Sequence, residues 1–103
     1  MCIIYVAGSF RGKNSWEIHN NVLKAERAMV KLIGEGYTPI CPHKMTENLQ
    51  GLYPDQVYLD MCLEFLKVSD AIYVLDNWKQ SKGTQVELRE AINLGLDIIY
   101  EEV

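Results

Sequence analysis

The sequence has few of the residues that build disulfide scaffolds, and it lacks the long apolar runs of membrane helices. Among 103 residues there are 3 cysteines, 3 prolines and 7 glycines. The cysteines, at positions 2, 41 and 62, are widely spaced and form no Cys-x-x-Cys pair, which favours reduced thiols. No apolar run approaches the roughly 20 residues of a membrane span, and the first residues lack a signal peptide's basic start. We therefore expect a cytoplasmic protein with no membrane partner.

A basic surface is also missing. Lys and Arg number 10 against 14 Asp and Glu, a formal net charge of −4. Binding long nucleic acid through its phosphates requires a basic face, so this class is excluded, whereas one small anionic ligand in a local pocket is not. The 2 histidines and 3 cysteines show no metal-ligand spacing, and we expect neither a metal nor a cofactor. A hydrophobic fraction of 49% fits one modest core, so residues 1–103 are interpreted as a single domain.

Short apolar runs alternate with amphipathic segments along the chain. Strands are predicted over residues 2–7, 37–40, 71–75 and 97–100, and helices over about 14–34, 55–68 and 84–94. Asn14 and Glu17 form a capping-box pattern at the start of the first helix. This order predicts an α/β fold, a flavodoxin- or Rossmann-like three-layer sandwich whose central parallel sheet has four to five strands and helices on both faces. Ligands in such folds bind at the carboxyl ends of strands, so the loops 8–14, 41–53 and 76–83 are where a site is expected.

The loop after the first predicted strand has a composition suited to an anion. It contains Gly8, Ser9, Arg11 and Gly12. Glycines let the backbone pass close to a ligand, a helix N-terminus offers unpaired N–H groups, and a guanidinium matches phosphate geometry. The alternative is an ordinary solvated turn with a surface arginine. The loop is neither a dinucleotide fingerprint nor a Walker A loop.

A second polar segment covers residues 76–87. Ser81 and Gly83 precede the third predicted helix, and Glu87 lies in its first turn. A carboxylate here could be catalytic. However, Thr84-x-x-Glu87 is also a capping-box pattern, in which Glu87 would only accept a backbone N–H. From the residues alone, the capping interpretation is favoured.

Taken together, these motifs resemble the nucleoside 2-deoxyribosyltransferase superfamily, and within it the 5′-deoxynucleotide N-hydrolases and small deoxyribosyltransferase-like proteins of phages and bacteria, the DUF4406 type. The residues that match are Tyr5, Gly8, Ser9, Arg11 and Gly12 in the first motif, Ser81, Gly83 and Glu87 in the second, and Ser69–Leu75 at the third strand. The resemblance spans nearly the whole chain.

The resemblance implies an enzyme that hydrolyses 2′-deoxynucleoside 5′-monophosphates to free base and deoxyribose 5-phosphate. In this interpretation Glu87 is the nucleophile and Tyr5 orients it. The 5′-phosphate would be held by Ser9, Arg11 and Ser81, with Gly8, Gly12 and Gly83 in the same loops. A carboxylate below C1′ suits the oxocarbenium-like state of glycosidic cleavage and can form a covalent glycosyl-enzyme.

The sequence departs from the family pattern in the second predicted helix. The family carries an aspartate there, eight residues before the position of Asp70, and this chain has Cys62. Asp60 is the nearest carboxylate and is the expected substitute, although it lies about 200° away around a helix. Either the acid–base role has moved or hydrolysis is weak or lost. Base exchange between nucleosides and non-catalytic nucleotide binding therefore remain alternatives.

Three further residues are candidates for substrate contact, and each has a plainer alternative. Trp78 could stack on a base or cover the sheet edge or a dimer contact. Asp76 could contact sugar or base or be a polar turn residue, and His43 could bind substrate or lie on the surface. The second helix is apolar on nearly every face, which together with the resemblance predicts a homodimer or higher homo-oligomer.

Overall fold

The computed structural model describes residues 2–102, and Met1 and Val103 lie outside the described residues. The strands are β1 (Ile3–Ala7), β2 (Thr38–Ile40), β3 (Ala71–Val74) and β4 (Asp97–Tyr100). The helices are α1 (Ser15–Gly34), α2 (Pro42–Thr46), α3 (Asp55–Lys67) and α4 (Lys82–Asn93), with a 3-10 turn η1 (Trp78–Gln80). The strands and the three long helices agree with the sequence predictions. Two elements differ, because α2 and η1 occupy segments that were predicted to be loops.

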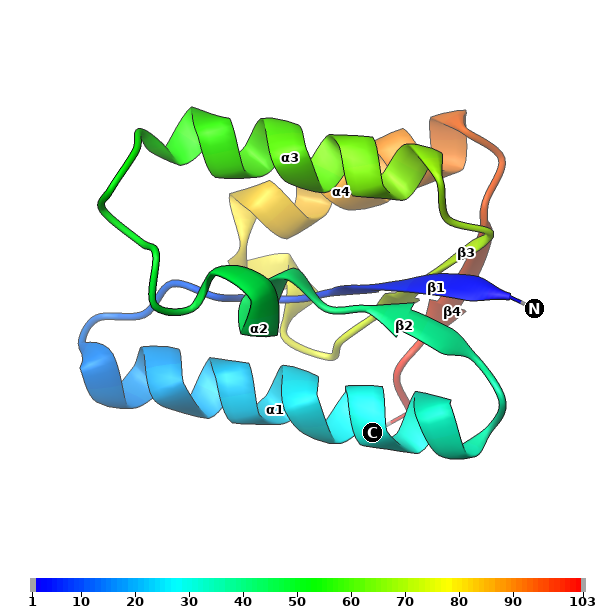
Figure 1. The fold of residues 1–103 in the computed structure, drawn as a ribbon, viewed down its shortest axis with the longest axis horizontal. Helices are drawn as coiled ribbons and strands as arrows, with labels where there is room; N and C mark the ends of the chain where they lie inside the picture. The colour runs from blue at the N-terminus through cyan, green and yellow to red at the C-terminus, as the bar shows by residue number, and fades with distance from the viewer. Residues whose placement is uncertain (1, 103) are drawn as a thin grey trace.

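The four strands form one parallel sheet in the order β2-β1-β3-β4. Helix α1 covers one face, and α3 and α4 cover the other (Figure 1). The predicted α/β three-layer sandwich is therefore confirmed, with four strands. The chain steps outward from β1 to β2 in one direction and from β3 to β4 in the other. The switch point, where such folds bind ligands, thus lies at the carboxyl ends of β1 and β3.

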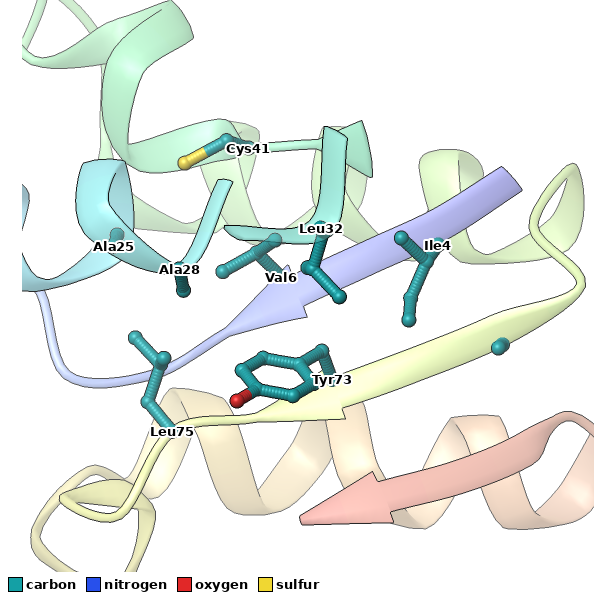
Figure 2. Packing of buried hydrophobic residues seen from close by; sticks show 9 residues of the cluster. Ile4, Val6, Ala25, Ala28, Leu32, Cys41, Tyr73 and Leu75 are labelled. Atoms are coloured by element: carbon teal, nitrogen blue, oxygen red, sulfur yellow. The ribbon is translucent and has the colours of Figure 1, made fainter. Parts of the chain in front are cut away.

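The side chains of β1 alternate between the two cores. Ile4 and Val6 face α1, where Ala25, Ala28 and Leu32 pack against them (Figure 2). Tyr5 and Ala7 face the opposite way and belong to the cluster beneath α3 and α4. This period of two is the normal consequence of strand geometry. It brings the Tyr5 ring under α3 and α4, at the level where the neighbouring loops begin.

The loop from β1 to α1 is held against the helix at several points. Asn14 caps α1, with its Oδ1 accepting from the Glu17 amide at 3.0 Å, as the capping-box pattern predicts. The Asn21 side-chain amide donates to the carbonyls of Phe10 and Arg11, each at 3.2 Å. A Cβ on Gly12 would lie 2.5 Å from the Glu17 Cβ, so this glycine allows the loop to pack on α1. The backbone of Arg11 therefore has a fixed position.

The two edge strands are anchored differently. In β2 the Thr38 amide donates to the Cys2 carbonyl at 2.9 Å, so Thr38 points its N–H towards β1 and Pro39 follows on the outer side. Beyond β4, the Lys24 side chain of α1 forms two ion pairs, with Asp76 at 2.6 Å and with Glu101 at 3.3 Å.

Across residues 2–102, none of the helices has the length and apolar character needed to cross a bilayer.

Candidate active site

A cavity of about 410 Å³ opens at the carboxyl ends of β1 and β3. Four segments line it: β1 with its following loop, α2 with the loop after it, the first half of α3, and the chain from the end of η1 into α4. Residues of all three loops in which a site was expected from the topology contribute to the lining, together with β1, α3 and α4. The cavity has a buried floor and an exposed mouth, and the two parts differ in their chemistry.

Glu87 and Tyr5 form the floor. Glu87 is 8% exposed and Tyr5 1% exposed, and the Tyr5 hydroxyl donates a hydrogen bond to Glu87 Oε2. The alternative in which Glu87 caps the helix start is wrong. Helix α4 begins two residues earlier than predicted, with Ser81 as the N-cap whose Oγ accepts from the Thr84 amide at 3.1 Å. Glu87 therefore lies in the second turn, faces Tyr5 of β1, and lines the cavity.

Burial controls the protonation of this pair. It raises the pKa of Glu87 from 4.5 to about 7, although the Tyr5 hydroxyl and the Cys62 thiol both act to lower it. Burial, and then the charge of Glu87, raise the pKa of Tyr5 well above its ordinary value. Tyr5 thus remains a hydrogen-bond donor. Glu87 stands near the midpoint of its titration at neutral pH, where a developing positive charge nearby would favour the carboxylate.

Cys62, rather than Asp60, reaches the floor from α3. Cys62 lines the cavity, and burial followed by the charge of Glu87 raises its pKa to about 12, so it is a thiol. Asp60 is exposed, does not line the cavity, and accepts from the Gln56 side chain at 2.8 Å. The rotation between the two positions on a helix explains this. The structure does not bring Asp60 to Glu87.

Charged groups define the mouth. Arg11 forms an ion pair with Asp55 in the first turn of α3, and both side chains line the cavity. Lys82, at the first position of α4, also lines it and forms no ion pair with any residue among 2–102. The first amides of a helix have no intrahelical acceptor, and a cation there opposes the helix dipole. Lys82 and the α4 N-terminus together form a region suited to an anion.

Ser9 and His43 connect the loops around the cavity. The Ser9 amide donates to Asn77 Oδ1 at 3.0 Å, and its hydroxyl donates to the Asn77 carbonyl at 3.2 Å. His43, in α2, is buried, and its Nε2 lies 3.0 Å from the Ser9 carbonyl. Because a carbonyl only accepts, Nε2 carries the proton, and burial lowers the pKa of the ring. The alternative of a surface His43 is therefore wrong, and the Ser9 hydroxyl is already engaged within the protein.

Two buried polar atoms have no partner among residues 2–102, His43 Nδ1 and Thr84 Oγ1. Both residues line this cavity. Buried polar groups are nearly always paired with protein, water or a ligand. Their coincidence in one place supports the interpretation of the cavity as a binding site.

The predicted glycines have different roles. A Cβ on Gly8 would lie 2.5 Å from Leu75 Cδ1, so Gly8 allows close packing at the end of β1. Gly12 packs on α1 and does not line the cavity. Gly83 does line it, and a Cβ there would meet only the Ser81 Oγ at 3.9 Å. Of the three, Gly83 alone both lines the cavity and has room for a Cβ.

Asp76 and Trp78 lie away from the cavity lining. Asp76 pairs with Lys24 on the α1 side of the sheet. The Trp78 ring packs against Tyr100, with ring centroids 6.0 Å apart, and contacts the core beneath α4. The structure thus agrees with the plainer alternatives, a polar turn residue for Asp76 and a sheet-edge cover for Trp78.

Asp55, Lys82 and Thr84 are cavity residues that the sequence reasoning did not single out. Lys82 carried a usable signal, because a lysine in the first turn of a helix is electrostatically unfavourable unless an anion is near. Asp55 carried none, since acidic residues are common at helix starts. Its partner Arg11 is 44 positions away in the chain.

Comparisons with known proteins agree with this architecture. The sequence profile of a family described as a domain of unknown function, DUF4406, matches residues 2–100. One similar solved structure is a 2-deoxyribosyltransferase from the psychrotolerant bacterium Bacillus psychrosaccharolyticus, characterised as a biocatalyst for nucleoside synthesis. Its sequence identity is 23% and its TM-score 0.67, over 98% of this chain and 76% of that chain.

A second is the 2-deoxyribosyltransferase from Leishmania mexicana, with 25% identity, a TM-score of 0.60, and coverage of 97% of this chain and 63% of that chain. The comparison with curated protein sequences gives no match. The resemblance drawn from the sequence motifs is confirmed by the profile and by both structures. The chain therefore belongs to the DUF4406 family and has the fold of the nucleoside 2-deoxyribosyltransferase superfamily.

Proposed function

We propose that the protein cleaves the N-glycosidic bond of 2′-deoxynucleoside 5′-monophosphates, giving free base and deoxyribose 5-phosphate. The observation that carries the proposal is the buried Glu87 carboxyl, hydrogen-bonded by Tyr5 at the floor of a cavity whose mouth has two cations. A buried carboxylate suits the positive charge of a sugar losing its base, and the cations suit a phosphate at the other end of the ligand.

In the proposed reaction Glu87 attacks C1′ as the bond to the base breaks. The Glu87 oxygen gains a bond to C1′, and the base leaves with the electron pair of the glycosidic bond. Water then attacks C1′ and breaks its bond to the Glu87 oxygen, which returns the carboxylate and releases the sugar phosphate. The proton that water loses balances the one that the departing base takes up. The Tyr5 hydroxyl holds one oxygen of Glu87 in place, which leaves the other for the attack on C1′.

The phosphate would lie at the mouth. Arg11 and Lys82 supply charge, the Ser81 hydroxyl can still donate its proton while accepting from Thr84, and the first amides of α4 point outward. Ser9 supports the loop instead, because its hydroxyl donates to Asn77. This assignment keeps Arg11 and Ser81 from the sequence prediction and replaces Ser9 by Lys82.

The departing base needs a proton or a hydrogen bond, because its anion leaves poorly. Apart from Glu87, the carboxylate that lines the cavity within residues 2–102 is Asp55, at the mouth. Two alternatives follow from this. Base exchange, in which a second base captures the sugar, fits the likeness in fold to 2-deoxyribosyltransferases. A nucleotide-binding module without turnover fits the thiol of Cys62 at the floor.

One experiment separates the three functions. The protein is incubated with each 2′-deoxynucleoside 5′-monophosphate, with and without a second free base, and released and exchanged bases are separated by chromatography. The proposal requires base release that falls at least about 1,000-fold in Glu87→Gln. Glu90→Gln, a change on the same helix outside the cavity lining, serves as the control. Exchange in excess of hydrolysis would indicate the transferase. Neither release nor exchange would reject both enzyme functions and leave the nucleotide-binding module.

We further propose that the protein is a cytoplasmic homodimer. The outer side of α3 and the preceding loop expose Leu52, Tyr53, Val57 and Met61, which line a second, apolar hollow of about 330 Å³. Exposed apolar patches of this kind mark contact surfaces. Light scattering coupled to size exclusion tests the assembly, and a monomer at all concentrations contradicts it.

A further inference from the structure

The ion pair between Arg11 and Asp55 crosses the mouth of the cavity and joins two segments that are far apart in the chain. Arg11 comes from the loop after β1, and Asp55 opens α3. Both line the cavity, and their side chains are 63% and 73% exposed. The Arg11 guanidinium at the mouth is therefore already paired with a carboxylate of the protein itself.

The backbone positions of Arg11 and Asp55 favour the ion pair, while both side chains remain exposed. The Arg11 carbonyl accepts from the Asn21 side chain of α1, so the backbone of the loop is held in place. Asp55 lies in the first turn of α3, where the helix dipole favours a negative charge. An entering phosphate would meet the Arg11 guanidinium together with its bound carboxylate, and would compete with that carboxylate for the same N–H donors.

Phosphorylated and unphosphorylated nucleosides should interact differently with this ion pair. The charged residues that line the cavity within residues 2–102 are Arg11, Lys82, Asp55 and Glu87. A phosphate dianion is repelled by Asp55 until the ion pair opens. An unphosphorylated nucleoside brings no charge to the mouth and leaves the pair intact.

We propose that Asp55 is a specificity-determining residue that lowers the affinity of the cavity for phosphorylated deoxynucleosides relative to unphosphorylated ones, by holding the Arg11 guanidinium. The proposal rests on the proposed function for the ligand class, and it adds a residue that opposes phosphate. Exposed ion pairs are weak, so a phosphate that also contacts Lys82 and the α4 N-terminus can displace Asp55. The pair therefore reduces nucleotide affinity without abolishing it.

The test measures binding by calorimetry in a Glu87→Gln background, which prevents turnover during titration. The ligands are the four 2′-deoxynucleoside 5′-monophosphates and the matching nucleosides. Asp55→Asn is expected to tighten nucleotide binding about fivefold and to change nucleoside binding less than about twofold. Asp55→Ser, which also suits a helix start, is the second variant.

Glu64→Gln is the matched control. It removes the same charge from the same helix, and Glu64 also forms an exposed ion pair, with Lys67, but it lies outside the cavity lining. Its nucleotide affinity should stay within about twofold of the parent. In an Arg11→Met background the gain from Asp55→Asn should disappear if the carboxylate acts through Arg11.

The proposal is overturned if Asp55→Asn leaves nucleotide affinity unchanged, weakens it, or tightens nucleotide and nucleoside equally. Absence of binding of all eight ligands to every variant overturns both this proposal and the proposed function. Selective tightening of nucleotide binding in a protein that releases no base supports the role of Asp55 while rejecting hydrolysis. The two failures are therefore distinguishable.

Discussion

The floor and the mouth of the cavity contain similar residue types in opposite environments. At the floor, Tyr5 and Glu87 are almost fully buried, and burial shifts the pKa of both side chains upward. At the mouth, Arg11 and Asp55 are mostly exposed. The same kind of group, a carboxyl beside a donor, is thus buried with a raised pKa in one place and an exposed, exchangeable contact in the other.

This difference arises from the elements that hold each part. Tyr5 lies in the central strand β1 and Glu87 in a helix packed on it, so neither can move without disturbing the core. The mouth residues lie on a loop and on a first helical turn, where water competes for every contact. We expect changes at the floor to alter stability and its pH dependence, and changes at the mouth to alter ligand choice.

The largest expected effect is on the pH dependence of stability. The pKa of Glu87 is raised in the folded state, so the proton stabilises the folded protein. That contribution is complete below pH 4.5 and is lost as the pH rises through about 7. The difference is on the order of 3 kcal/mol. Glu87→Gln should remove this loss, which urea unfolding at several pH values would measure.

Over part of the same pH range, His43 changes the stability of the folded protein in the opposite direction. Burial lowers its pKa below 6.5, so its contribution is present above that pH and is lost as the pH falls. The difference between the wild-type and Glu87→Gln curves therefore isolates Glu87, since His43 is common to both. Parallel curves would show that the Glu87 carboxyl is not perturbed by burial.

Tyr5→Phe tests the hydrogen bond at the floor. Loss of a donor to a buried charge costs about 1.5–3 kcal/mol, so the rate at neutral pH should fall about 10- to 100-fold. Because the Tyr5 hydroxyl lowers the pKa of Glu87, the pH–rate profile should also move to higher pH. Tyr100→Phe, at an exposed ring, is the control. A slower variant with an unmoved profile would assign Tyr5 a packing role only.

Gly83→Ala separates folding from binding at the border between floor and mouth. The position is helical and has room for a Cβ, so alanine should stabilise the protein by about 0.5–1 kcal/mol. Because Gly83 lines the cavity, a methyl group there should take up space near the ligand and lower nucleotide affinity. Thermal unfolding and calorimetry measure the two effects. A variant that is more stable and binds equally well would place the phosphate away from the α4 N-terminus.

The smallest expected effect on stability is at the mouth. Arg11→Gln should change the free energy of unfolding by less than about 0.5 kcal/mol, because exposed ion pairs contribute little. Nucleotide binding should nevertheless weaken clearly. Lys67→Gln breaks a comparable exposed pair far from the cavity and should affect neither property. A large loss of stability in Arg11→Gln would mean that the mouth is part of the folding core.

Much of the fold follows from local patterns in the sequence. The apolar run at 71–75 predicts β3 closely, because buried parallel strands are short and continuously apolar. The β-branched and aromatic residues within 97–100 predict β4, an edge strand whose side chains are half-buried or exposed. Helix α2 was missed, because Pro42 and Gly51 make the segment resemble a loop, and Gly51 does adopt a positive φ of 88°. A single helical turn has no periodicity to detect.

The place of the candidate site was predictable from the order of strands and helices, and its residues from the family resemblance. The likeness to a known family identified Tyr5, Glu87 and Arg11, and all three line the cavity. The start of α4 was misplaced because Ser81 and Thr84 are both good caps, and tertiary packing of Glu87 decides between them. The partner of Arg11 and the burial of His43 depend on contacts between distant segments, which local patterns do not contain.

Pro39 has a consequence for how copies of this chain can meet. The Thr38 amide points towards β1, so the next residue of β2 faces outward, and at that position proline has no N–H. Within its three residues, β2 therefore offers no outward donor for another strand. Continuation of the sheet from one molecule into the next is blocked on this side. Sheet extension between chains would therefore use the β4 edge, and the β2 edge is protected against fibrous stacking.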